Sequence, residues 1–156
     1  MTGRADFSEE EWARIKRAPF VAGMAISLAD PGGPIELVKE TAATLKTVRN
    51  ATGHGELVEA IAGEVVGERK NPLHDFRPKG ALAGQEILEE LGEVNRIVSA
   101  KAGEEDAAAY RELLKTAAQE AANAAKEGGF LGFHAERVSE GEQKMLDSLR
   151  DVLSEG

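Results

Sequence analysis

The stretch PFVAGMAISLA at residues 19–29 constrains the fold more than any other part of the sequence. Only Ser27 interrupts its apolar side chains, so a helix formed here is apolar on every side. Such a helix is stable in water only when other elements cover it all round. The stretch is about half the roughly 20 residues that are needed to span a bilayer. We therefore expect it to be the mostly buried, central first helix of an all-α bundle.

Two local signals set the limits of this first helix. Ser8 and Glu11 form a capping box at its start, because each side chain can bond the backbone amide of the other. The segment DPGGP at 30–34 ends it. Pro19 lies between these limits, lacks a backbone amide and crowds the preceding turn. We expect Pro19 to kink the helix or to restart it.

Apolar residues at three- and four-residue spacing predict the remaining helices. Glycine- and proline-containing segments, such as NATGHG at 50–55 and the polar loop at 68–80, separate them. Period-two alternation is missing and aromatic residues make up only 4 % of the chain, so strands are not expected. The pattern indicates one domain over residues 1–156, a bundle of five to six helices, with further helices at about 34–49, 57–65, 82–98, 110–125 and 139–153.

Composition narrows the partners and the cellular compartment. The formal net charge of -9 repels phosphate backbones and no basic stripe interrupts it, so we expect no nucleic-acid partner. No apolar run is long enough for a membrane span. The chain contains no cysteine, which excludes disulfides and thiolate sites. The first residues, MTGRADFSEEEW, have one Arg and no apolar h-region, so we expect no signal peptide. A bacterial cytoplasmic protein is the expected class.

The three histidines are the candidate ligands for a metal ion or a small molecule. His54, His74 and His134 all lie in predicted loops, with Asp75 and Glu136 close in sequence. If they converge in space, they form a histidine–carboxylate site. The alternative is that each is a half-exposed loop residue that bonds the backbone. A di-iron bundle needs Glu-x-x-His pairs, and the sequence has none.

Signatures of catalysis are also missing from the sequence. It has neither a Gly-x-Ser-x-Gly elbow nor a phosphate-binding loop of the Walker type. Tyr110 and Lys115 have suitable chemistry for an acid or a base, but no neighbouring residue orients them. We assign no catalytic residue and no cofactor.

The loop GGFLGF at 128–133 is unusually apolar for a connection between two helices. Phe130, Leu131 and Phe133 supply more apolar surface than a solvated loop normally exposes, and burial of each is worth about 1.5–3 kcal/mol. They plug the end of the bundle, contact a partner or a second copy, or line a ligand pocket. The sequence leaves these three interpretations open.

Two stretches, EEWARIKRAPFVAGMAISLADPGGP and EGGFLGFHAERVSEGEQKMLDSL, resemble a group of uncharacterised small all-helical bacterial proteins. That group combines an Ala-Gly-Met run and an Asp-Pro turn with a Gly-Phe-Leu-Gly-Phe loop before a Ser-x-x-Glu helix start. Here His134-Ala135 stands where the group has Gly-Gly. The resemblance covers mainly the two ends of the chain and implies no activity. VSEGEQKMLDSL is also faintly similar to helical domains of tellurite-resistance proteins.

These observations favour a non-catalytic module that binds a protein partner or assembles with itself, with Phe130, Leu131 and Phe133 as its first candidate contacts. The alternative is a small-ligand or metal-ion binding protein of a stress-related helical type, with a cavity near the Pro19–Met24 region. An enzyme with a scattered carboxylate site is a third hypothesis.

Overall fold

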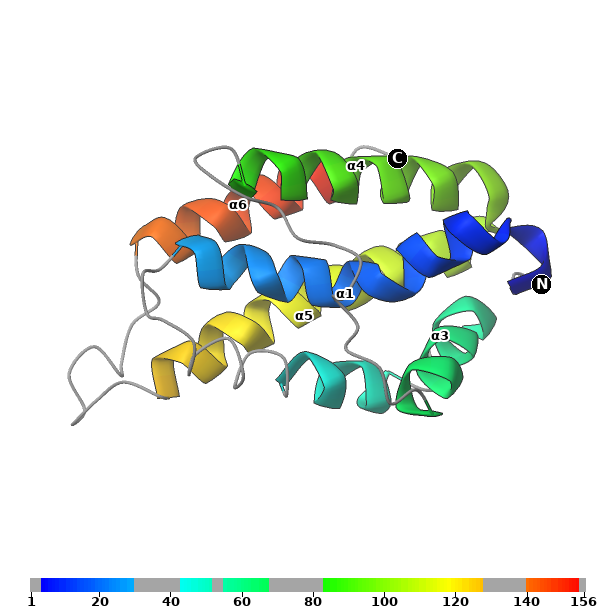
Figure 1. Ribbon diagram of the computed structural model, residues 1–156, viewed down its shortest axis with the longest axis horizontal. Coiled ribbons are helices and arrows are strands. Elements are labelled where there is room, and N and C mark those ends of the chain that lie inside the picture. The colour runs from blue at the N-terminus through cyan, green and yellow to red at the C-terminus, as the bar shows by residue number, and fades with distance from the viewer. Residues whose placement is uncertain (1–3, 30–42, 52–54, 68–82, 128–139, 155–156) are drawn as a thin grey trace.

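The computed structural model describes residues 4–29, 43–51, 55–67, 83–127 and 140–154. These residues are almost entirely helical and contain no strand, which confirms the predicted all-α bundle (Figure 1). The elements are a short 3-10 helix at Arg4–Asp6, α1 at Glu9–Ala29, a helical segment at 43–50, α3 at Glu56–Gly67, α4 at Ala83–Lys101, α5 at Glu104–Glu127 and α6 at Glu140–Ser154.

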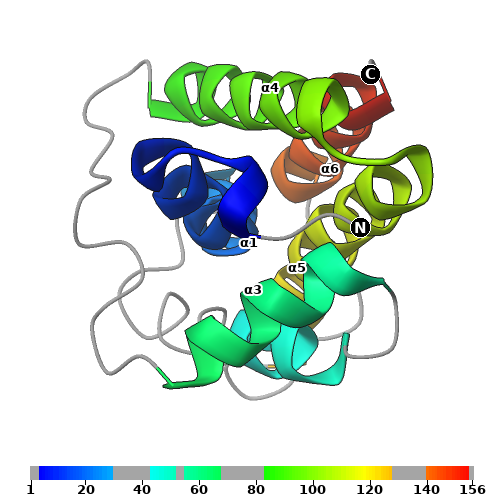
Figure 2. The same cartoon turned by 90° about the vertical axis from the view of Figure 1, so that its right-hand side faces the viewer.

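Helix α1 is the centre of the bundle, as the all-round apolar stretch predicts. It packs against α3, α4, α5 and α6. Seen from the end, α4 and α6 lie above it and α5 and α3 lie beside and below it (Figure 2). Its buried hydrophobic residues occur on every side of the helix and are Trp12, Ile15, Ala18, Phe20, Val21, Ala22, Ala25 and Ile26.

The predicted capping box opens α1. The Glu11 amide donates to Ser8 Oγ at 3.1 Å, and the Ser8 amide donates to Glu11 Oε1 at 2.9 Å. Lys101 at the end of α4 also donates to Glu11 Oε1. These hydrogen bonds hold the pKa of the Glu11 carboxyl below its usual value, and the bond from Lys101 has the largest effect. The start of α1 is thereby tied to the end of α4.

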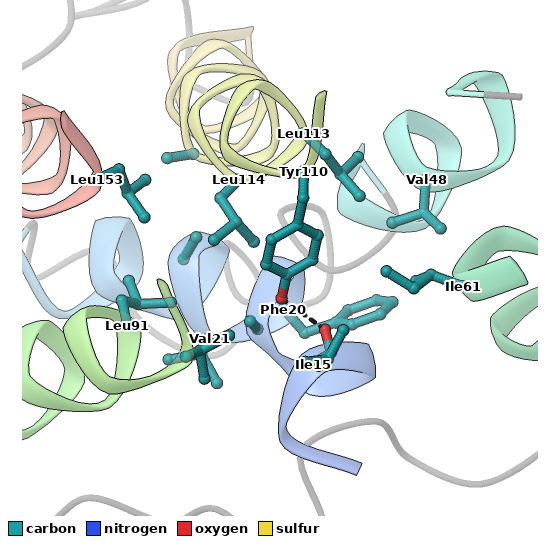
Figure 3. Packing of buried hydrophobic residues seen from close by; sticks show 14 of the residues in the cluster. Ile15, Phe20, Val21, Val48, Ile61, Leu91, Tyr110, Leu113, Leu114 and Leu153 are labelled. Atoms are coloured by element: carbon teal, nitrogen blue, oxygen red, sulfur yellow. Dashed lines mark hydrogen bonds between the residues drawn. The ribbon is translucent and has the colours of Figure 1, made fainter. Parts of the chain in front are cut away.

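Pro19 neither ends nor restarts α1, which continues through it to Ala29. Proline has no amide to donate to the carbonyl four residues earlier, which belongs to Ile15. Tyr110 of α5 supplies the missing donor, because its hydroxyl lies 2.8 Å from the Ile15 oxygen (Figure 3). A contact from another helix therefore replaces the hydrogen bond that Pro19 removes.

Alanine side chains allow α5 to approach α1 closely. Four of them on one face of α5 are buried, namely Ala117, Ala118, Ala121 and Ala122. The predicted apolar faces of the other helices are confirmed too, among them Leu57, Ile61, Ile87, Leu91, Leu149 and Leu153, which are at most 1 % exposed. None of the helices in the described ranges is long and apolar enough to cross a membrane.

Candidate functional site

All the site residues that the sequence suggested lie outside the described residues. They are Phe130, Leu131, Phe133, His54, His74, Asp75, His134 and Glu136. The plug, contact and pocket interpretations of the Phe loop and the histidine–carboxylate hypothesis therefore stay predictions. Among the residues that the structure does describe, no group of three His, Cys, Asp or Glu side chains is placed to hold a metal ion.

The region around Pro19 is closely packed. Phe20, Val21 and Ala22 are at most 2 % exposed. A methyl group added at Gly23 would lie 2.6 Å from the Thr44 hydroxyl oxygen, so α1 and the 43–50 helix touch here. A groove lies elsewhere among the described residues.

A groove of about 650 Å³ lies between the 43–50 helix, α5 and α3. Its apolar lining consists of small and medium side chains, namely Ala43, Ala51, Val58, Ala109 and Leu113. Hydroxyl and amide groups from the two walls add hydrogen-bonding capacity, and they belong to Thr47, Asn50, Thr116 and Asn123. The groove thus combines an apolar floor with polar edges, as binding sites commonly do.

Helical periodicity brings the α5 residues to one wall. The lining positions 109, 112, 113, 116, 120 and 123 recur every three or four residues, so they form one stripe along the helix. This stripe is about 21 Å long at a rise of about 1.5 Å per residue. The opposite wall uses positions 43, 46, 47, 50 and 51 in the same way, and Val58 of α3 contributes from the side.

The two long walls carry opposite charges. Lys46 lies on the 43–50 helix, whereas Glu112 and Glu120 lie on α5. All three side chains are exposed. Glu112 makes a 3.5 Å ion pair with Lys115 of its own helix, although 72 % of the Glu112 side chain remains exposed. A ligand that enters the groove therefore meets one basic and one acidic side.

Packing of buried residues holds the walls in place. Thr44 and Val48 anchor the 43–50 helix in the core. Trp12 of α1 fixes α3, because its indole Nε1 donates to Glu64 Oε2 at 2.9 Å. Gly55, at the start of α3, has a φ of 114°, which favours glycine, and an added methyl group there would lie 2.6 Å from Asp106 Oδ1.

Two partly buried carboxylates, those of Glu64 and Glu90, form ion pairs with basic side chains of α1 and of the residues that precede it. Glu64 pairs with Arg4 at 3.1 Å and Lys16 at 3.5 Å. Glu90 of α4 accepts hydrogen bonds from Arg14 and Arg17. The hydrogen bond between Glu90 and Arg14 raises the pKa of the Arg14 guanidinium. These ion pairs tie α3 and α4 to α1.

The two acid–base candidates are also engaged in contacts within the fold. Tyr110 is fully buried and donates to the Ile15 carbonyl. Burial raises the pKa of its phenol well above the usual value, so the hydroxyl stays protonated. Lys115 pairs with Glu112. Neither residue lines the groove.

The chain matches no family model, no curated protein sequence and no solved structure. The groove itself was missed in the sequence because it depends on which helices are neighbours. Its one available signal is the spacing of Glu112, Thr116, Glu120 and Asn123, which places a polar stripe directly beside the alanine face of α5.

Proposed function

We propose that this chain is a non-catalytic binding module that assembles with itself or with a protein partner through the groove between the 43–50 helix and α5. The observation that carries the proposal is the groove's form. An elongated groove between two helices, with an α5 wall about 21 Å long, a small apolar floor and polar and charged edges, suits a helix laid lengthwise better than a compact molecule.

The distribution of charged groups supports binding over catalysis. The carboxylates that are most withdrawn from water in ion pairs, Glu90 and Glu11, are matched by basic side chains. Those that line the groove, Glu112 and Glu120, are exposed and well placed for contacts with a partner. A cytoplasmic bacterial location and a protein rather than a nucleic-acid partner are parts of the same proposal, supported by the cysteine-free, acidic composition.

Size-exclusion chromatography with light scattering over a wide concentration range tests the proposal, together with affinity capture from a bacterial extract. Assembly of the purified chain, or a captured protein that is lost when Thr116 is replaced by Lys, would support it. Thr116→Lys adds a charge at an exposed residue that lines the groove, whereas Ala108→Lys adds one at an exposed residue of α5 that does not line it and serves as the control. A chain that neither assembles nor captures a protein through the groove contradicts the proposal.

The groove also favours a second candidate function, small-ligand binding. Its volume of about 650 Å³ falls within the roughly 300–1,000 Å³ of ordinary ligand sites. A molecule with an apolar body and both an amine and a carboxylate would match Lys46, Glu112 and Glu120. Such a ligand would raise the melting temperature further as its concentration increases above its Kd, and Thr116→Lys would reduce the rise. If screened amphiphilic compounds produce no shift, this candidate fails.

A further inference from the structure

The 43–50 helix has a buried side and a basic outer side. Thr44 and Val48 point into the core and are at most 1 % exposed. Lys46, Arg49 and Asn50 are exposed. This outer side runs along the edge of the groove, so the helix is both a wall of the groove and a ridge on the surface.

The opposite wall offers the complementary charge. Glu112 and Glu120 stand two turns apart on the exposed side of α5. Within the residues that the structure describes, neither Lys46 nor Glu120 has an ion-pair partner, and Glu112 has only the solvent-exposed pair with Lys115. Exposed pairs of this kind contribute little to folding, so these charges remain available for an external contact.

We propose that the groove receives the 43–50 helix of a second copy of this chain, in a two-fold symmetric dimer. This inference rests on the proposed binding function and names its partner. In a two-fold interface the same surfaces meet twice. Lys46 and Arg49 of each copy lie against Glu112 and Glu120 of the other, and the two 43–50 helices lie side by side between the two α5 helices.

Dimensions and side-chain size agree with this arrangement. The described residues 43–50 cover about 12 Å of helix and the α5 wall is about 21 Å long, so these residues can lie along the wall. Ala43, Ala51 and Ala109 line the groove with methyl groups only, which allows close approach of a second helix. A second copy is favoured over another partner because the chain itself supplies the basic ridge that the acidic wall requires.

Charge reversal on one wall at a time tests the dimer by sedimentation equilibrium. In a dimer of Lys46→Glu, the new glutamate of each copy lies against Glu112 and Glu120 of the other. In a dimer of the double variant Glu112→Lys, Glu120→Lys, the new lysines of each copy lie against Lys46 and Arg49 of the other. Each variant alone should weaken dimerisation by about tenfold or more, because the repulsion occurs at both symmetric contacts. An equimolar mixture of the two variants should recover wild-type affinity, since every contact in the mixed dimer again joins opposite charges.

Matched controls and outcomes separate this inference from the broader proposal. Glu89→Lys reverses an exposed charge on α4, away from the groove, and should leave the dimer unchanged. Circular dichroism should show equal helicity for all variants. A wild-type chain that stays monomeric throughout overturns the dimer, and capture of another protein then decides the proposed function. A wild-type dimer that ignores both reversals, or a mixture that does not recover, overturns this interface but leaves self-assembly standing.

Discussion

The hydroxyl of Tyr110 donates to the carbonyl oxygen of Ile15, which is the carbonyl that Pro19 leaves without an intrahelical donor. Tyr110 is fully buried, so water cannot take over this bond. The central helix of the bundle can therefore contain a proline only because a neighbouring helix completes its hydrogen bonding.

This relationship predicts a coupling between Tyr110 and Pro19. Tyr110→Phe should lower the free energy of unfolding by about 1–3 kcal/mol, because it leaves the buried Ile15 carbonyl unpaired. In a Pro19→Ala background the cost should be smaller, since the introduced alanine would donate its own amide to the Ile15 carbonyl. Urea denaturation of the two single variants and the double variant measures the difference. Equal costs in both backgrounds would show that the hydroxyl does not compensate for the proline.

Tyr110 also predicts behaviour in alkali. Its folded pKa lies well above the ordinary value of 10.0, because burial penalises the charged phenolate. Its stabilising contribution is therefore complete below pH 10.0 and is lost as the pH rises through the folded pKa. Since Tyr110 is the only tyrosine, tyrosinate absorbance reports on it alone. We expect this absorbance to rise together with the loss of helical circular dichroism. Ionisation of a still-folded chain near the ordinary tyrosine pKa would contradict the buried position.

Contact between Gly23 and Thr44 predicts the cost of adding a single methyl group. Gly23→Ala should be less favourable than Gly→Ala at an uncrowded helical position by about 1–3 kcal/mol, because the new Cβ would lie 2.6 Å from Thr44 Oγ1. Gly63→Ala on α3 is the control: nothing lies within 4 Å of its Cβ position, and the change should stabilise the helix by about 0.5–1 kcal/mol. Thermal unfolding compares the two.

Replacing Thr44 identifies the cause of that cost. In a Thr44→Ala background the nearest neighbour of the new methyl group, apart from residue 44 itself, is the Ala121 Cβ at 3.8 Å, which is an ordinary contact. Gly23→Ala should then cost much less. An unchanged cost would place the obstruction in the backbone of α1 rather than at the 43–50 helix.

The Phe loop supplies a prediction from the sequence alone. Replacing Phe130 and Phe133 by Ser should weaken assembly with little loss of helicity if these residues contact a partner. Global unfolding would instead favour the interpretation that they plug the bundle end. Circular dichroism and light scattering on the same sample distinguish the two outcomes, and Lys46→Glu provides the comparison for an interface at the groove.

Local chemistry explains how much of the fold the sequence predicts. The capping box of Ser8 and Glu11 involves residues three apart, and an apolar face such as Ile87, Leu91, Val94 and Val98 follows from helical periodicity, so both were found. The continuity of α1 through Pro19 was not predicted in full, because the compensating hydroxyl belongs to a helix that lies 95 residues further along the chain.

Pairing between helices explains what sequence reasoning missed. Asn95 lies on α4 and is 1 % exposed, yet its type and neighbours suggest a solvated position. It is buried because its amide donates to the Val152 carbonyl of α6 and its oxygen accepts from Arg111 of α5. The groove has the same origin, since its walls come from two segments that are not adjacent in the chain.

Native mass spectrometry of the wild-type chain, as purified and without added metal or chelator, tests self-assembly most directly. We predict a dimer mass that equals twice the chain mass, with no additional species, and a dimer fraction that grows with protein concentration. A chain that remains a monomer at every concentration contradicts this prediction. A monomer that carries a reproducible extra mass contradicts it as well, and favours the alternative of a small-ligand or metal-ion binding protein.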